Sequence, residues 1–119
     1  MKNLRKTGAE YESLAAEYLK RRGFRIIRRN FYCRGGEIDL IALDGDSLVF
    51  VEVKYRRTDT FGNPLEAVNA TKQKRICRAA SYFCMRYGYG EQTPCRFDVV
   101  GICGNGEIAH VRNAFEYRV

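Results

Sequence analysis

Charged residues interrupt two stretches of this sequence that otherwise have the composition of buried strands. Glu37 and Asp39 lie within Gly-Glu-Ile-Asp-Leu-Ile-Ala, and Glu52 and Lys54 lie within Leu-Val-Phe-Val-Glu-Val-Lys. Upstream, Glu12 falls in a helical pattern. An ionised group that is removed from water costs several kcal/mol unless it is paired or bound to a metal ion. These residues therefore predict a site for a divalent metal ion.

The two stretches are predicted to form an antiparallel hairpin. Residues 43–47, Leu-Asp-Gly-Asp-Ser, have the composition of a tight turn. If Gly45 and Asp46 are the two loop residues, the register places two charged pairs opposite each other: Asp39 with Glu52, and Glu37 with Lys54. A slip of one residue would send Asp39 to the other face of the sheet.

Two carboxylates directly opposite each other destabilise a strand pair, and a cation between them reverses the sign of that interaction. Mg²⁺ or Mn²⁺ prefers carboxylate, carbonyl and water oxygens, so Asp39, Glu52 and the backbone carbonyl of Val53 are candidate ligands. Lys54 could then hold an attacking water and offset charge that develops on phosphorus. The alternative is a cross-strand ion pair between Glu37 and Lys54, with the other two carboxylates in solvent.

The spacing of these residues resembles the Asp…(Asp/Glu)-x-Lys core of the PD-(D/E)XK nuclease superfamily. Ile38 stands where the superfamily motif has proline. The fuller resemblance is to the YraN-like family of small bacterial proteins, which resemble archaeal Holliday junction resolvases. It covers almost the whole chain: Gly8, Glu12, Ala15, residues 18–19, 36–42 and 50–54, Arg56, residues 61–62, Val68, Lys72, residues 96–100, His110 and residues 113–115.

This resemblance implies a restriction-endonuclease-like fold and metal-dependent cleavage of phosphodiester bonds. The products would be 5′-phosphate and 3′-hydroxyl ends, and the substrate would be DNA with branches or flaps. Five residues receive catalytic roles. Glu12 is the helical acidic residue, which supports the metal through water or holds a second ion. Asp39 and Glu52 are metal ligands, Lys54 is the catalytic lysine, and Gln73 is a glutamine on the second helix.

The periodicity of the sequence predicts an α/β fold in the order helix, three strands, helix, two strands, with a central mixed five-stranded sheet flanked by helices in three layers. One unit, residues 1–119, is expected. The second helix has two candidate caps, Asn63 before Pro64 and Asn69, and we prefer Asn69. The other predicted elements are a helix at 7–22 and strands at 24–32, at both arms of the hairpin, at 96–103 and at 107–112.

Glu12 lies at the edge of the apolar stripe of the first helix, where a carboxylate can lean over the sheet. The alternative is an ordinary half-exposed helical glutamate. Just before the acidic stretch, Gly35 and Gly36 would allow a close approach of backbone, either to a phosphate or within a tight turn.

Net charge indicates the class of partner. Lys and Arg number 21 against 14 Asp and Glu, which gives +7. Nucleic acid, DNA by the resemblance, is the natural counterpart of such a surface. Cations near a helix N-terminus also oppose the helix dipole unless an anion binds there. The candidate nucleic-acid-binding residues are Arg34, Arg56, Arg57, Lys72, Lys74 and Arg75.

Other features indicate a protein whose cysteines are reduced and which has no membrane-spanning segment. Five widely spaced cysteines and one histidine do not form a zinc or disulfide pattern, no apolar run is long enough for a bilayer, and we expect a cytoplasmic location. A salt bridge is expected for Asp98 and a structural hydrogen bond for His110. A homodimer is consistent with the resolvase resemblance. The rival functions are a non-catalytic nucleic-acid-binding module on a nuclease fold and a protein-interaction domain.

Overall fold

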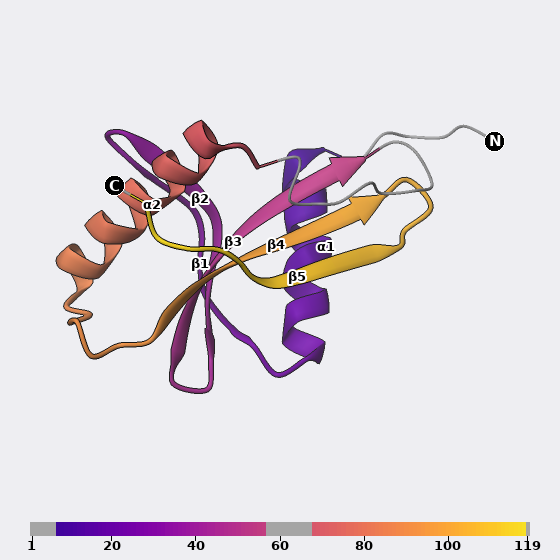
Figure 1. Cartoon of the computed structure of the whole chain (residues 1–119). Coiled ribbons are helices and arrows are strands. Elements are labelled where there is room, and N and C mark those ends of the chain that lie inside the picture. Colours follow the sequence, from indigo (N-terminus) through magenta and orange to yellow (C-terminus); the bar gives the residue numbers. More distant parts are fainter. Residues whose placement is uncertain (1–6, 57–67, 119) are drawn as a thin grey trace.

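The computed structural model of the chain describes residues 7–56 and 68–118. Two helices and five strands follow one another in the predicted order (Figure 1). Most boundaries lie within one or two residues of the prediction, and the last strand is longer than predicted. The elements are α1 (Gly8–Arg21), β1 (Arg25–Cys33), β2 (Gly36–Asp44), β3 (Ser47–Arg56), α2 (Ala70–Tyr87), β4 (Cys95–Cys103) and β5 (Ile108–Phe115).

The strands form one mixed sheet in the order β1-β2-β3-β4-β5. Strands β1, β2 and β3 are antiparallel neighbours, β3 pairs in parallel with β4, and β4 is antiparallel to β5. Helix α2 provides the crossover that a parallel pair requires. The predicted α/β fold with a mixed five-stranded sheet is therefore confirmed.

Each helix begins at a polar cap. The Thr7 hydroxyl accepts the Glu10 N–H at 3.2 Å, and the Glu10 carboxylate accepts the Thr7 N–H at 2.6 Å, which forms a capping box. At α2, Asn69 Oδ1 accepts the Lys72 N–H at 2.9 Å. The preferred start at Asn69 is confirmed, and the alternative cap at residues 63–64 lies outside the described residues.

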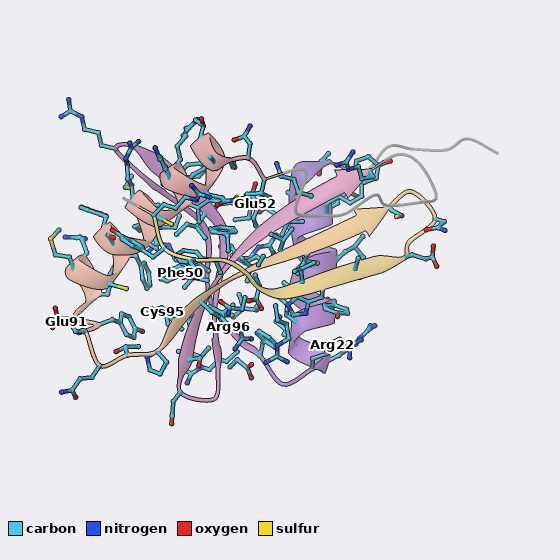
Figure 2. The ribbon with its side chains drawn as sticks, viewed as in Figure 1. Arg22, Phe50, Glu52, Glu91, Cys95 and Arg96 are labelled. Carbon is cyan, nitrogen blue, oxygen red and sulfur yellow. The ribbon has the colours of Figure 1, made fainter. Side chains whose placement is uncertain are left out.

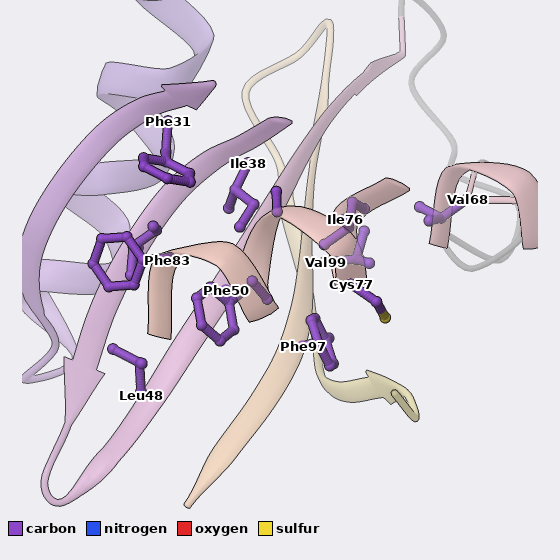
Figure 3. Close-up of a cluster of buried hydrophobic side chains, with 13 residues drawn as sticks. Phe31, Ile38, Leu48, Phe50, Val68, Ile76, Cys77, Phe83, Phe97 and Val99 are labelled. Carbon is purple, nitrogen blue, oxygen red and sulfur yellow. The ribbon is translucent and has the colours of Figure 1, made fainter. Parts of the chain in front are cut away.

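The helices cover opposite faces of the sheet, and each face has its own apolar core. On the α1 side, Leu19 packs with Leu40 and Val51. On the α2 side, Phe83 packs with Phe50 and with other fully buried side chains (Figure 3). Each Å² of apolar surface that is removed from water contributes about 25 cal/mol to stability. Because apolar surface is buried on both faces, the sheet is held as the middle layer. The predicted three-layer arrangement is present.

The β2 strand does not alternate strictly along its length. Ile38 packs in the α2-side core, whereas Leu40, two residues later, packs in the α1-side core. A regular strand would place both on one face. On β1, Asn30 has a positive φ of 53° between Arg29, which pairs with Leu40, and Phe31, which pairs with Ile38. The β1–β2 hairpin therefore changes face at Asp39.

The paired glycines lie at a tight turn that packs closely against a helix. A Cβ built on Gly36 would overlap the backbone carbonyl of Arg75 in α2. Gly35 has a φ of +97° and lies beside the side chain of Arg78. The predicted tight turn is therefore found, and an approach to phosphate stays a prediction.

No disulfide joins the cysteines in the described residues, and Cys77 and Cys103 are buried. In the parts of the chain that the structure describes, no helix combines the length and apolarity needed to cross a membrane.

Substitution Gly36→Ala should destabilise the fold by about 1–3 kcal/mol, because the added methyl group forces α2 away from the sheet. Urea unfolding followed by circular dichroism measures this loss. The control is Gly8→Ala at the start of α1, where an added Cβ meets no atom within 4 Å. Equal stability of the two variants would contradict the close packing of α2 on β2.

Candidate metal centre

Strands β2 and β3 separate at Asp39. Their ladder runs from the pair Asp44 and Ser47 to the pair Leu40 and Val51, which is the predicted register. One step further, the Asp39 carboxylate accepts the Val53 N–H at 2.8 Å. A side chain thus replaces the backbone acceptor that a continued ladder would supply, and it brings Asp39 to the residue that follows Glu52.

The predicted pairing of Glu37 with Lys54 is wrong. The strands no longer pair beyond Leu40 and Val51, and Glu37 pairs instead with Tyr32 of β1. The twist at Asp39 turns the end of β2 toward β1 and away from β3.

The Glu52 side chain is 4% exposed and lies next to the Asp39 carboxyl group. Burial and the adjacent Asp39 charge raise the pKa of Glu52 from 4.5 to about 7, and burial also raises the pKa of Asp39. Burial therefore disfavours the ionised form of both carboxyl groups.

Two lysines approach the same oxygen of Glu52. Lys54 Nζ lies 3.3 Å and Lys72 Nζ lies 3.5 Å from Glu52 Oε2. Figure 2 shows Glu52 beside the first turn of α2, which carries Lys72. The other oxygen, Oε1, is buried without a hydrogen-bond partner. The lysines offset only part of the burial cost, since the pKa of Glu52 remains raised.

Glu12 of α1 faces the same cluster from the other layer. Its Oε1 is also buried without a hydrogen-bond partner. Burial and then the Asp39 charge raise the pKa of Glu12, while a hydrogen bond from Asn30 and the charge of Arg29 oppose this effect. Glu12 is thus a half-buried helical glutamate, as the alternative described, with one carboxyl oxygen buried toward the charges of β2.

These donors fit a hard divalent cation that retains water ligands. Asp39 and Glu52 supply two carboxylates, and Mg²⁺ is commonly bound through one or two carboxylates. The orphan Oε1 of Glu52 is a free acceptor of the required kind. Within residues 7–56 and 68–118, no three His, Cys, Asp or Glu side chains converge closely enough to hold an ion together. The metal roles of Glu12 and of the Val53 carbonyl stay predictions.

Gln73 is held by two contacts of its own. Its Nε2 donates to the Val68 carbonyl at 2.9 Å, and its Oε1 accepts from Arg118 Nε at 2.7 Å. Sequence reasoning missed Arg118, because it lies 45 residues from Gln73 and no local pattern links them. Gln73 therefore connects the segment before α2 with Arg118 near the C-terminus.

The remaining basic candidates lie around this cluster rather than in it. Arg34, Lys74 and Arg75 are exposed, and Arg56 is half-buried at the end of β3. The Arg75 backbone packs against Gly36 at the turn that carries Arg34. The predicted residue Arg57 lies outside the described residues.

Asp98 of β4 is a buried carboxylate of a different kind. It accepts from Arg96 Nε at 3.0 Å and from the Asn113 N–H at 3.0 Å, and it lies 2.8 Å from His110 Nε2. Burial alone would raise its pKa, but these partners outweigh burial and lower it. The predicted salt bridge of Asp98 and the structural hydrogen bond of His110 are confirmed.

Comparison with known proteins places the chain in a family. A family profile described as "Uncharacterised protein family UPF0102" matches residues 11–102. The chain belongs to this family. It is 44% identical over 119 residues to a UPF0102 protein of Stutzerimonas stutzeri, with 98% of this chain and 99% of that protein covered. It is 51% identical over 115 residues to a UPF0102 protein of Symbiobacterium thermophilum, with coverage of 93% and 97%.

The raised pKa of Glu52 predicts how stability depends on pH without metal. The folded chain binds this proton more tightly than the unfolded chain, whose glutamates have a pKa near 4.5. The stabilisation is fully present below pH 4.5 and is lost as the pH rises through about 7, by about 3 kcal/mol.

Urea unfolding in EDTA at about pH 5 and about pH 8 measures this loss. In Glu52→Gln, which cannot ionise, most of the pH-dependent difference should disappear. The same loss in both proteins would show that Glu52 is not the group responsible.

Proposed function

We propose that this chain is a metal-dependent nuclease that hydrolyses phosphodiester bonds, with Asp39 and Glu52 as the ligands of one Mg²⁺ or Mn²⁺ ion. The observation that carries the proposal is the proximity of half-buried Asp39 to buried Glu52 at the point where β2 and β3 separate. The chain keeps these two carboxyl groups together although the Asp39 charge raises the pKa of Glu52. A divalent cation would convert the repulsion between them into binding energy.

The contrast with Asp98 supports a functional reading of this pair. Where the chain needs a buried carboxylate for structure, it surrounds it with Arg96, His110 and a backbone N–H, and the pKa falls. At Glu52 one oxygen has no hydrogen-bond partner and the pKa rises. Groups whose pKa is perturbed in this way concentrate at functional sites.

The side chains around the pair suit phosphoryl chemistry. When bound, Mg²⁺ or Mn²⁺ supplies Lewis-acid stabilisation of the phosphate and lowers the pKa of a water ligand. Lys54 would orient the attacking water and stabilise charge on the phosphate oxygens. Glu12 would accept a hydrogen bond from a water at its free Oε1. Gln73 would support the site by holding the segment that leads into α2.

The exposed basic residues support nucleic acid as the substrate. Arg34, Lys74 and Arg75 lie on the β1–β2 turn and on the first turns of α2, the end of the helix that also carries Lys72 to Glu52. Salt-sensitive contacts to phosphates are expected from such a surface. The α-β-β-β-α-β-β order is that of a restriction-endonuclease-like fold, so we propose membership of the PD-(D/E)XK superfamily. Branched or flapped DNA and a homodimer are the resolvase-like forms of this proposal.

The test is cleavage of labelled branched, flapped, linear and single-stranded DNA with Mg²⁺, Mn²⁺ or EDTA. The native chain should cut at least one of these in a metal-dependent way, and Glu52→Ala should abolish cutting. Lys54→Met should lower the rate by about 10²–10³-fold, as expected for loss of one charged group that acts in the transition state.

The matched control is Lys20→Met, which removes the same charge from an exposed position on α1 and should leave the rate unchanged. Equal activity of the native chain and Glu52→Ala would reveal a contaminating nuclease. Salt-sensitive binding of DNA without cutting by any protein would contradict the nuclease and favour the non-catalytic binding module. Binding of proteins that is insensitive to salt would favour an interaction domain.

A further inference from the structure

Lys72 contacts the metal centre from a separate layer of the fold. It lies on α2, and its Nζ is 3.5 Å from Glu52 Oε2, the oxygen that Lys54 also approaches at 3.3 Å. The Lys72 side chain is 29% exposed, so much of its length is covered. The Lys72 ammonium group therefore lies beside Glu52, the carboxylate that the proposed function assigns to a metal ion.

The location of Lys72 has an energetic cost that its contact with Glu52 offsets. The first turn of α2 contains no acidic residue, and the partial positive charge of a helix N-terminus disfavours a cation there. The backbone N–H of Lys72 is taken by Asn69 Oδ1. In the described parts of the chain, Glu52 is the carboxylate paired with Lys72.

The charges in the cluster differ between the two states of the centre. Without a metal ion, the ammonium groups of Lys54 and Lys72 are the positive charges paired with Glu52. A divalent ion bound at Glu52 would repel both ammonium groups and replace them as the counter-charge. A lysine that leaves Glu52 would then be available to pair with another anion.

We propose that Lys72 is the internal counter-ion of Glu52 in the metal-free protein and that metal binding releases it to contact a phosphate of the nucleic acid. Lys72 is the lysine that moves, because Lys54 lies on the same strand as Glu52 and has less freedom to leave it. The N-terminus of α2 is also a favourable place for a phosphate once Lys72 is free. This inference rests on the proposed metal centre.

The first test is Mn²⁺ binding without nucleic acid, measured from the electron paramagnetic resonance signal of free Mn²⁺. Lys72→Met should bind Mn²⁺ about tenfold more tightly than the native chain, because a competing positive charge near the ion is removed. Lys72→Arg retains the charge and should bind like the native chain. The control Lys20→Met removes one exposed charge far along α1 and should also bind like the native chain.

The second test uses a phosphorothioate DNA oligonucleotide, which resists cleavage, and follows its affinity as salt rises. Saturating Mn²⁺ should make the slope of log affinity against log salt steeper by about one for the native chain and for Lys20→Met, because one more phosphate contact forms. For Lys72→Met the slope should not change when Mn²⁺ is added.

The outcomes separate this inference from the function on which it rests. Equal Mn²⁺ affinity in Lys72→Met and Lys20→Met, with binding lost in Glu52→Gln, would overturn the role of Lys72 and leave the metal centre intact. Absence of Mn²⁺ binding in every protein would overturn the metal centre and this inference with it. Circular dichroism of each variant shows whether Lys72→Met is folded, and Lys72→Gln serves if it is not.

Discussion

The bond from the Val53 N–H to the Asp39 carboxylate is the interaction on which the centre depends. At this point β2 stops pairing with β3, and a side chain takes over one hydrogen bond that the sheet would otherwise make. The hydrogen bond to Val53 holds the Asp39 carboxylate next to Glu52, the residue before Val53. The positive φ of Asn30 and the change of face in β2 accommodate the same separation. The twist of the hairpin and the proximity of the two carboxyl groups thus have one origin.

Buried Asp98 and half-buried Asp39 show how the surroundings decide the pKa of a carboxylate. Asp98 also accepts a backbone N–H, from Asn113, at a place where the pairing of β4 with β5 is irregular. Arg96 and His110 complete its shell, and its pKa falls. Asp39 also receives an N–H, from Val53, but burial outweighs this contact and raises its pKa. A carboxylate that accepts a backbone N–H thus has a lowered pKa where cations complete its surroundings and a raised pKa where burial dominates.

The assembly of the centre uses all three layers of the fold. Strand β3 brings Glu52 and Lys54, α1 brings Glu12 from one face, and α2 brings Lys72 from the other. The Gly36 contact with the α2 backbone sets how near the helix can come. Because one methyl group there would displace the helix, the distance from Lys72 to Glu52 depends on a residue with no side chain.

The sequence by itself determined the elements, their order and the register of the hairpin, because apolar periodicity, caps and tight turns are local signals. It also indicated Asp39, Glu52 and Lys54, since charge inside an apolar strand is visible without a structure. Only the tertiary structure decided that Glu37 does not pair with Lys54 and that Gly36 packs against the backbone of α2. It also decided that Lys72 contacts Glu52 and that Arg118 donates a hydrogen bond to Gln73. These outcomes depend on strand twist and on contacts between distant segments, and neither leaves a periodic signal in the chain.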